Sequence, residues 1–185
     1  MQDNALLIRD YLINDGWSIE SIAGMLGNMQ YESNINPGIY EGLDSSSTTN
    51  GYGLVQWTPN TKYKNWVDST YGDADYGNLY YNLDRINYEL ANNIQWIPRI
   101  LGVPFPNMTF AQFKVSTASP FDLAVQFVHC YERPLSPNNF QRGTAGNYWY
   151  TFLTGNPPIP PSENVKKTKF KWVLYARKLR NKKSQ

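Results

Sequence analysis

Apolar residues recur at helical spacing along much of the chain. From residue 4 to 14 and from 19 to 32, every third or fourth position is apolar, as on the buried face of an amphipathic helix. Ser18 precedes the second segment and is a favourable N-cap residue. The same periodicity, with Ser119 and Pro120 as start signals for one segment, predicts five further helices, at 60–71, 78–93, 109–117, 119–134 and 145–153.

One short stretch has a different pattern. "GYGLVQW" at 51–57 contains two glycines, and its residues Tyr52, Leu54 and Gln56 are spaced two apart. In an extended chain such residues share one face. We therefore predict an α+β fold, mostly α, in which a small β-hairpin or extended segment lies beside a helical lobe.

Composition divides the chain into three parts. Residues 1–154 carry the periodic segments and form the predicted domain, "GNPPIPPSEN" at 155–164 is a proline-rich linker, and 165–185 form a basic tail. The tail carries nine Lys and Arg residues between 166 and 183 and no acid. We expect it to contact a polyanion such as teichoic acid, a membrane surface or another protein, and we expect no specific nucleic-acid partner.

Several functional classes receive no support from the sequence. The start, "MQDNALLIRD", lacks a basic region and a long apolar stretch, so we expect no signal peptide. Cys130 is the only cysteine and cannot form an internal disulfide. His129 has no neighbouring ligand pattern, so we predict no metal site. No cofactor-binding motif is found, and we expect no cofactor.

Glu32 occupies an unusual position for an acid. The apolar stripe through Ile22, Met25 and Met29 continues onto it at the end of the second helix. Burial disfavours a charged carboxylate, so an acid there can keep its proton and donate it to a leaving group. The alternative is a solvated glutamate at a helix end. A polar loop and the glycine-rich stretch follow, which is the layout of lysozyme-like active sites.

Four stretches together resemble the phage tail lysozyme family over roughly residues 4–154. They are "GMLGNMQYESNINPG", "GYGLVQWTP", "YERP" at 131–134 and "RGTAGNYWY" at 142–150. Members of that family are peptidoglycan-cleaving domains on the tails of phages that infect Gram-positive bacteria. The resemblance implies a lysozyme-like fold, a glycan-strand substrate and a catalytic glutamate at Glu32.

Roles follow for the acids. Glu32 is the expected general acid, and Asp44 the expected second carboxylate, since hydrolysis generally uses two. Glu41 is the alternative second carboxylate and otherwise contacts substrate. Glu132 and Arg133 are expected behind the cleft, either as a structural ion pair or as residues that influence Glu32.

Substrate contacts are expected from the glycine-rich stretch. Polar groups of Tyr52 and Gln56 are predicted to reach an N-acetyl group or the attacking water, with ordinary packing as the alternative. Trp57 and Thr58 are predicted to line the cleft.

The predicted function is that of a lysozyme, an N-acetylmuramidase that hydrolyses the MurNAc–GlcNAc β-1,4 bond of peptidoglycan. One alternative is a lytic transglycosylase acting on the same bond, and another is a non-catalytic tail or wall-binding protein. We expect the protein on the virion tail with other tail proteins as partners. The alternative location is the host cytoplasm and then the wall, as for an endolysin at lysis.

Overall fold

The computed structural model describes residues 1–98 and 108–156. The basic tail and residues 157–164 of the predicted linker lie outside the described residues. The helices are α1 (Gln2–Asn14), α2 (Ile19–Ser33), η1 (Glu41–Leu43), α3 (Thr61–Tyr71), α4 (Leu79–Ala91), α5 (Phe110–Lys114), α6 (Pro120–Phe127), η2 (Val128–Glu132) and α7 (Asn139–Thr154).

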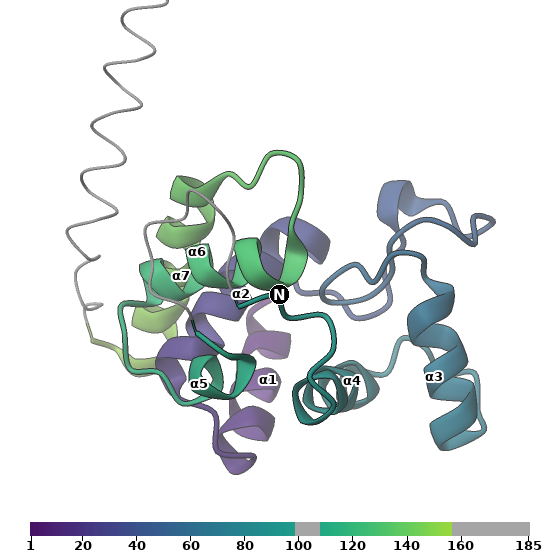
Figure 1. Ribbon diagram of the computed structural model, residues 1–185, viewed down its shortest axis with the longest axis horizontal. Helices are drawn as coiled ribbons and strands as arrows, with labels where there is room; N and C mark the ends of the chain where they lie inside the picture. Colours follow the sequence, from purple (N-terminus) through teal and green to yellow (C-terminus); the bar gives the residue numbers. More distant parts are fainter. Residues whose placement is uncertain (99–107, 157–185) are drawn as a thin grey trace, which may run out of the picture.

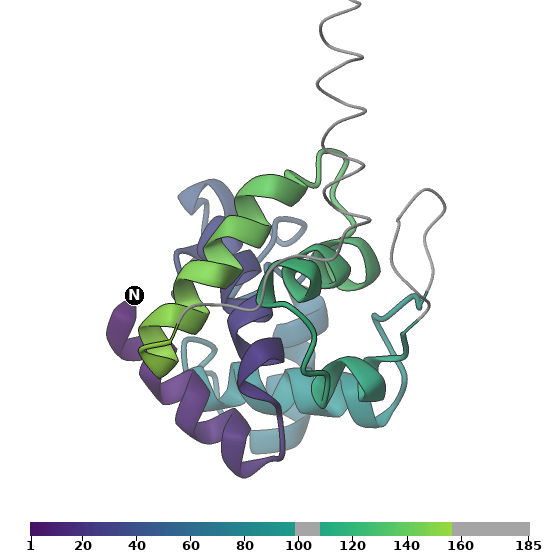
Figure 2. The ribbon, with the colours of Figure 1, turned by 90° about the vertical axis from the view of Figure 1, so that its left-hand side faces the viewer.

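Helix α2 is the centre of the larger lobe. It packs against α6 and α7, which also contact each other, and Figure 2 shows α7 lying along its outer side. The predicted apolar stripe is confirmed, because Ile22, Met25 and Met29 have no exposed surface. Ser18 caps the helix as predicted, its hydroxyl accepting a hydrogen bond from the Ser21 N–H at 3.2 Å.

Glycines allow these helices to approach closely. A Cβ added at Gly27 on α2 would lie 2.6 Å from the nitrogen of Gly146 on α7, and one at Gly24 would lie 2.9 Å from the nitrogen of Ala124 on α6. The backbones therefore touch where side chains would normally separate them. This close contact fixes the end of α2 relative to α7.

The second part of the fold contains α3 and the loops that flank it, which lie to one side of the lobe with α4 between (Figure 1). The buried carboxylate of Glu89 on α4 joins these parts. It accepts hydrogen bonds from Trp57 Nε1 at 3.0 Å, from Arg85 Nε at 3.0 Å and from the Tyr131 hydroxyl. Burial raises the pKa of Glu89, and these three donors oppose that rise.

The predicted strand at 51–57 is wrong. Residues 53–56 form a turn, closed by a hydrogen bond from the Gln56 N–H to the Gly53 carbonyl at 3.2 Å. Gly53 and Gln56 both have positive φ, at 82° and 51°, which an extended strand does not adopt. The described residues contain one isolated antiparallel bridge, between Tyr40 and Tyr52, and no strand. Apart from this bridge, the regular secondary structure of the described residues is thus helical.

Two helices differ in detail from their predictions. The helix predicted at 119–134 changes from α6 to a single π turn, η2, and ends at Arg133, which has a φ of 55°. Helix α7 begins at Asn139, six residues before the predicted start at 145. In the described residues, no helix is long and apolar enough to span a membrane.

Candidate active site

A cleft of about 470 Å³ opens between the end of α2, the loop after it, the turn at 53–58 and the end of η2. The end of α2 with its following loop, the turn and the end of η2 are far apart in the sequence and meet at this cleft. The lining residues are Tyr31, Glu32, Ile39, Tyr40, Glu41, Gly42, Leu43, Gln56, Thr58, Glu132 and Pro134.

Glu32 lies in this cleft and is paired with an arginine. Its Oε1 is 2.5 Å from Nη2 of Arg142 on α7, and the two side chains are 19% and 7% exposed. Nη1 of Arg142 donates to Oδ1 of Asn28 at 3.1 Å, so the guanidinium is held at two points along α2. A charge-assisted bond of this kind fixes the orientation of the carboxylate.

Glu132 brings a second carboxyl to the same cleft, from the end of η2. Its Oε1 is buried and has no hydrogen-bond partner among the described residues. Burial is the largest cause that raises the pKa of Glu132 well above its ordinary value; the charge of Glu32 adds to the rise and Arg142 opposes it. The protonated form of Glu132 is therefore favoured beside Glu32.

The opposite wall carries Glu41, at the start of η1. Its Oε2 accepts a hydrogen bond from the Gly51 N–H at 2.9 Å, which ties the loop to the turn that follows. The predicted second carboxylate, Asp44, is exposed and absent from the lining. It accepts hydrogen bonds from the N–H and hydroxyl of Ser46 at 2.9 and 2.6 Å, and these lower its pKa.

Of the predicted substrate-binding residues, Gln56 and Thr58 line the cleft with Glu41. The Gln56 amide donates to the Gly53 carbonyl at 2.9 Å and to the Ile39 carbonyl at 3.3 Å, so it also braces the cleft wall.

Tyr52 and Trp57 do not line the cleft. Both are buried, at 5% and 3% exposure. Trp57 stacks on Tyr63 with ring centroids 4.7 Å apart, and the Tyr52 ring meets the Tyr40 ring edge-on at 4.6 Å. Because the stretch turns, Tyr52 does not share a face with Gln56.

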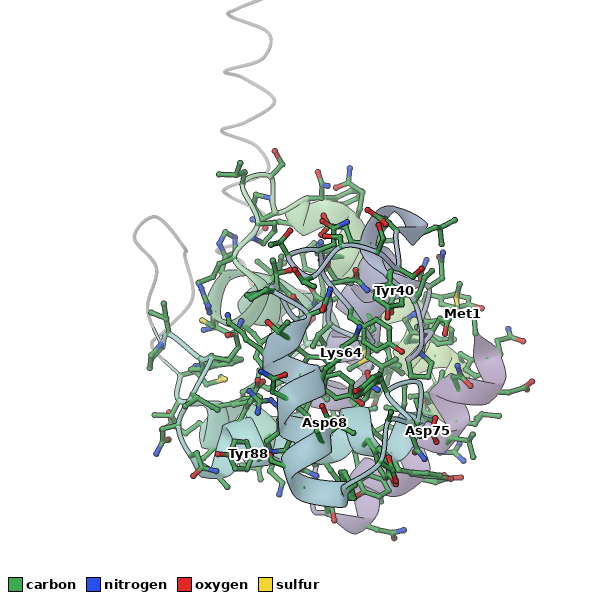
Figure 3. The ribbon with its side chains drawn as sticks, turned by 90° about the vertical axis from the view of Figure 1, so that its right-hand side faces the viewer. Met1, Tyr40, Lys64, Asp68, Asp75 and Tyr88 are labelled. Atoms are coloured by element: carbon green, nitrogen blue, oxygen red, sulfur yellow. The ribbon has the colours of Figure 1, made fainter. Side chains whose placement is uncertain are left out.

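Tyr40 lines the cleft and is held in place from outside it. Figure 3 shows Lys64 on α3 beside Tyr40, with Asp68 further along the same helix. The Lys64 ammonium donates to the Tyr40 hydroxyl at 2.7 Å. The contact fixes the ring at the cleft edge.

Arg133 points away from Glu132. Its guanidinium Nη1 donates to the Cys130 carbonyl at 2.6 Å and also to the Gln95 carbonyl. No ion pair forms between Glu132 and Arg133. Glu132 therefore faces Glu32, and Arg133 caps the end of η2.

Within 1–98 and 108–156, no group of three or more His, Cys, Asp or Glu residues could hold a metal ion. Nε2 of His129 is hydrogen-bonded to Oδ1 of Asn139 at 2.9 Å. Burial raises the pKa of Cys130 to about 11, so the thiol stays protonated. The acids that line the cleft are Glu32, Glu41 and Glu132.

Sequence reasoning missed Tyr31 and Tyr40, which line the cleft, and Arg142, which pairs with Glu32. Arg142 was visible inside the stretch "RGTAGNYWY", where a single charge stands among small and aromatic residues. Its pairing with Glu32 spans 110 positions, and local periodicity carries no signal over that separation.

Comparison with known proteins gives two findings. A family model described as phage tail lysozyme matches residues 3–153. The chain is also similar to Morphogenesis protein 1 of Bacillus phage B103, with 48% identity over 155 residues. The matched region is 84% of this chain and 40% of that relative, so the chain spans less than half the length of the curated protein it matches.

Proposed function

The chain belongs to the phage tail lysozyme family, and from this premise we propose that it hydrolyses the MurNAc–GlcNAc β-1,4 bond of peptidoglycan as a muramidase. The observation that carries the proposal is the cluster of Glu32 and Glu132 in the cleft lining, with Arg142 paired to Glu32. Two carboxyls and one guanidinium, partly withdrawn from water, place an acid where a glycosidic oxygen would lie.

In the proposed reaction, Glu32 gives its proton to the glycosidic oxygen as the bond from C1 to that oxygen breaks. The bonding electrons leave with the oxygen, and C1 acquires positive charge. Glu41, on the opposite wall and held by the Gly51 N–H, stabilises that charge. Water then adds to C1 and returns a proton to Glu32. This is the two-carboxyl chemistry of glycoside hydrolysis.

Glu132 has a supporting role in this scheme. Since burial favours the protonated form of Glu132, that residue adds little repulsion to the ionised Glu32 that forms after proton transfer. Glu132 thus limits the negative charge beside Glu32 after the glycosidic bond breaks.

Lytic transglycosylation is the second candidate. It needs one acid only, because the C6 hydroxyl of MurNAc attacks C1 in place of water. The position of Asp44, exposed and outside the cleft lining, favours this alternative, since it leaves one fewer carboxylate to activate water.

The relative's name, Morphogenesis protein 1, supports a location on the virion. We propose that the protein is a tail component that opens the wall during entry, with glycan strands as substrate and other tail proteins as neighbours. Teichoic acid is the proposed ligand of the basic tail. A role in host lysis is the alternative.

The test is digestion of purified Gram-positive peptidoglycan by the wild-type chain and by Glu32→Gln. We expect wild-type digestion to yield reducing ends by mass spectrometry, and Glu32→Gln to yield almost none. Glu20→Gln, on the same helix and outside the cleft, is the matched control and keeps activity. Products with 1,6-anhydro ends would establish transglycosylation, and near-wild-type digestion by Glu32→Gln would refute the assignment of Glu32.

A further inference from the structure

A second groove, of about 350 Å³, lies on the outer side of the catalytic cleft, between the end of α2 and the first half of α7. Three of its lining residues are aromatic: Tyr31, Phe140 and Tyr148. Their exposed fractions are 48%, 51% and 50%. We call it the aromatic groove. Exposed rings grouped in this way indicate a binding surface more often than rings scattered singly.

The aromatic groove and the cleft adjoin at Tyr31, which lines both. The ring of Tyr31 is fixed by the guanidinium of Arg142, whose Cζ lies 5.7 Å from the ring centroid. The same guanidinium pairs with Glu32. One arginine therefore sets both the catalytic carboxylate and the ring that separates the two cavities.

Helix geometry explains how α7 presents the groove. Phe140, Thr144 and Tyr148 are four residues apart and so lie on one face of α7. The ring of Phe140 meets Phe121 at 6.1 Å, and the Tyr148 hydroxyl accepts from Nε2 of Gln2 at 3.3 Å. Both side chains thus contact a neighbouring residue, while about half of each stays exposed to solvent.

The lining of the aromatic groove is uncharged throughout, with amides from Gln30 and Gln141 among the rings. A peptide stem of the cell wall carries carboxylates and an amine, which would need charged partners. A pyranose ring offers an apolar face and hydroxyl or N-acetyl groups, which suit aromatic rings and amides.

We infer that the aromatic groove is an additional sugar-binding site that holds the glycan strand beyond the residues at the scissile bond. This inference rests on the proposed function of the cleft and extends it. A polymeric substrate must extend past the cleft, and the aromatic groove adjoins the cleft at Tyr31. The rings bind the strand by stacking on its sugars, and the carboxyl groups of the cleft carry out the reaction.

The experiment measures the affinity of chitin oligomers for the inactive Glu32→Gln chain by calorimetry. We expect a hexamer to bind about tenfold more tightly than a trimer, the order expected for one or two added ring contacts. Phe140→Ala with Tyr148→Ala in the same background should remove this gain and leave trimer affinity unchanged. Tyr80→Ala, an exposed tyrosine outside both cavities, is the matched control and should keep the gain.

The outcomes separate this inference from the function on which it rests. A hexamer gain that survives the double substitution, or a trimer that binds with no hexamer gain, overturns the aromatic groove alone. Binding of neither oligomer overturns the proposed glycan function as well. Binding of a free stem peptide that the double substitution abolishes would assign the groove to peptide and overturn the sugar assignment. Circular-dichroism melting of each variant verifies that it is folded.

Discussion

Nη2 of Arg142 lies 2.5 Å from Oε1 of Glu32, which ties the start of α7 to the end of α2. Removing the guanidinium with Arg142→Met leaves a mostly buried carboxylate without its partner. We expect a loss of about 2 kcal/mol in unfolding free energy, less than the roughly 3–5 kcal/mol of a fully buried pair, because Glu32 keeps 19% exposure. Urea denaturation measures the loss, and peptidoglycan turnover should fall with it.

Two variants sharpen this test. Arg142→Lys keeps the charge but not the planar fork that reaches Glu32 and Asn28 together, so only part of the stability should return. Arg9→Met removes an exposed pair with Asp10 and should cost no more than about 1 kcal/mol. Equal losses for Arg9→Met and Arg142→Met would contradict a special role for the Glu32 contact.

Glu132 should give the protein a distinctive pH dependence. Its pKa is raised in the folded state, so between the unfolded value of about 4.3 and the folded one the native state binds more protons. Stability from this group is therefore full below the unfolded pKa and is lost as pH rises through the folded pKa. Glu132→Gln lacks this loss, so its stability relative to wild type should increase from pH 4 to pH 7.

Asp44→Asn is the control, because the contribution of Asp44 to stability depends on pH in the opposite direction. Hydrogen bonds from Ser46 lower the pKa of Asp44, so its contribution is present at neutral pH and is lost on acidification. Its stability difference from wild type should therefore change only at acidic pH. Urea titrations across the pH range measure both variants. A curve of unfolding free energy against pH for Glu132→Gln that runs parallel to that of wild type would contradict the raised pKa of Glu132.

Much of the helical architecture could be predicted from the sequence. The apolar period places α1 to α4 within a few residues, because their buried faces are regular and their start signals are local, as at Ser18. The same period leads directly to Glu32 as an acid on a buried face. The sequence pattern was sufficient to predict a helix wherever residues nearby in the chain determine which face is buried.

The failures share a different cause. Tyr52, Leu54 and Gln56 alternate as a strand would, but the Asn82 side chain accepts from the Leu54 N–H at 3.0 Å and holds a turn there. Gly143 argues against a helix by propensity, yet α7 contains it and packs it closely against the ring of Phe121. Each error arises from a contact between residues distant in the sequence, which a local sequence pattern cannot predict.

Gly27→Ala tests the close packing of α2 on α7. Alanine normally favours a helix over glycine by about 1 kcal/mol. Here the added Cβ would lie 2.6 Å from the Gly146 nitrogen and 2.7 Å from the Arg142 carbonyl oxygen, both backbone atoms. We expect a net loss of roughly 1–3 kcal/mol, as for other overpacked sites, together with reduced activity as α7 moves away from Glu32.

Gly38→Ala is the matched substitution. A Cβ there would meet no atom closer than 3.5 Å, so urea denaturation should register little change. A Gly27→Ala variant as stable and as active as wild type would show that α2 and α7 separate without disturbing the Arg142–Glu32 pair.

The loop carboxylates provide the last prediction. Glu41 lines the cleft and is fixed by the Gly51 N–H, whereas Asp44 is exposed and bonded to Ser46. If Glu41 stabilises the positive charge at C1, Glu41→Gln should lower kcat by about a hundredfold with KM nearly unchanged, as for the loss of one preorganised electrostatic contact. Asp44→Asn should keep kcat within about twofold, because a solvated surface charge contributes little to a neighbouring site. Turnover of a soluble glycan substrate measures both variants. The reverse ranking would return the second carboxylate to Asp44, and full activity in both would favour a single-acid transglycosylase.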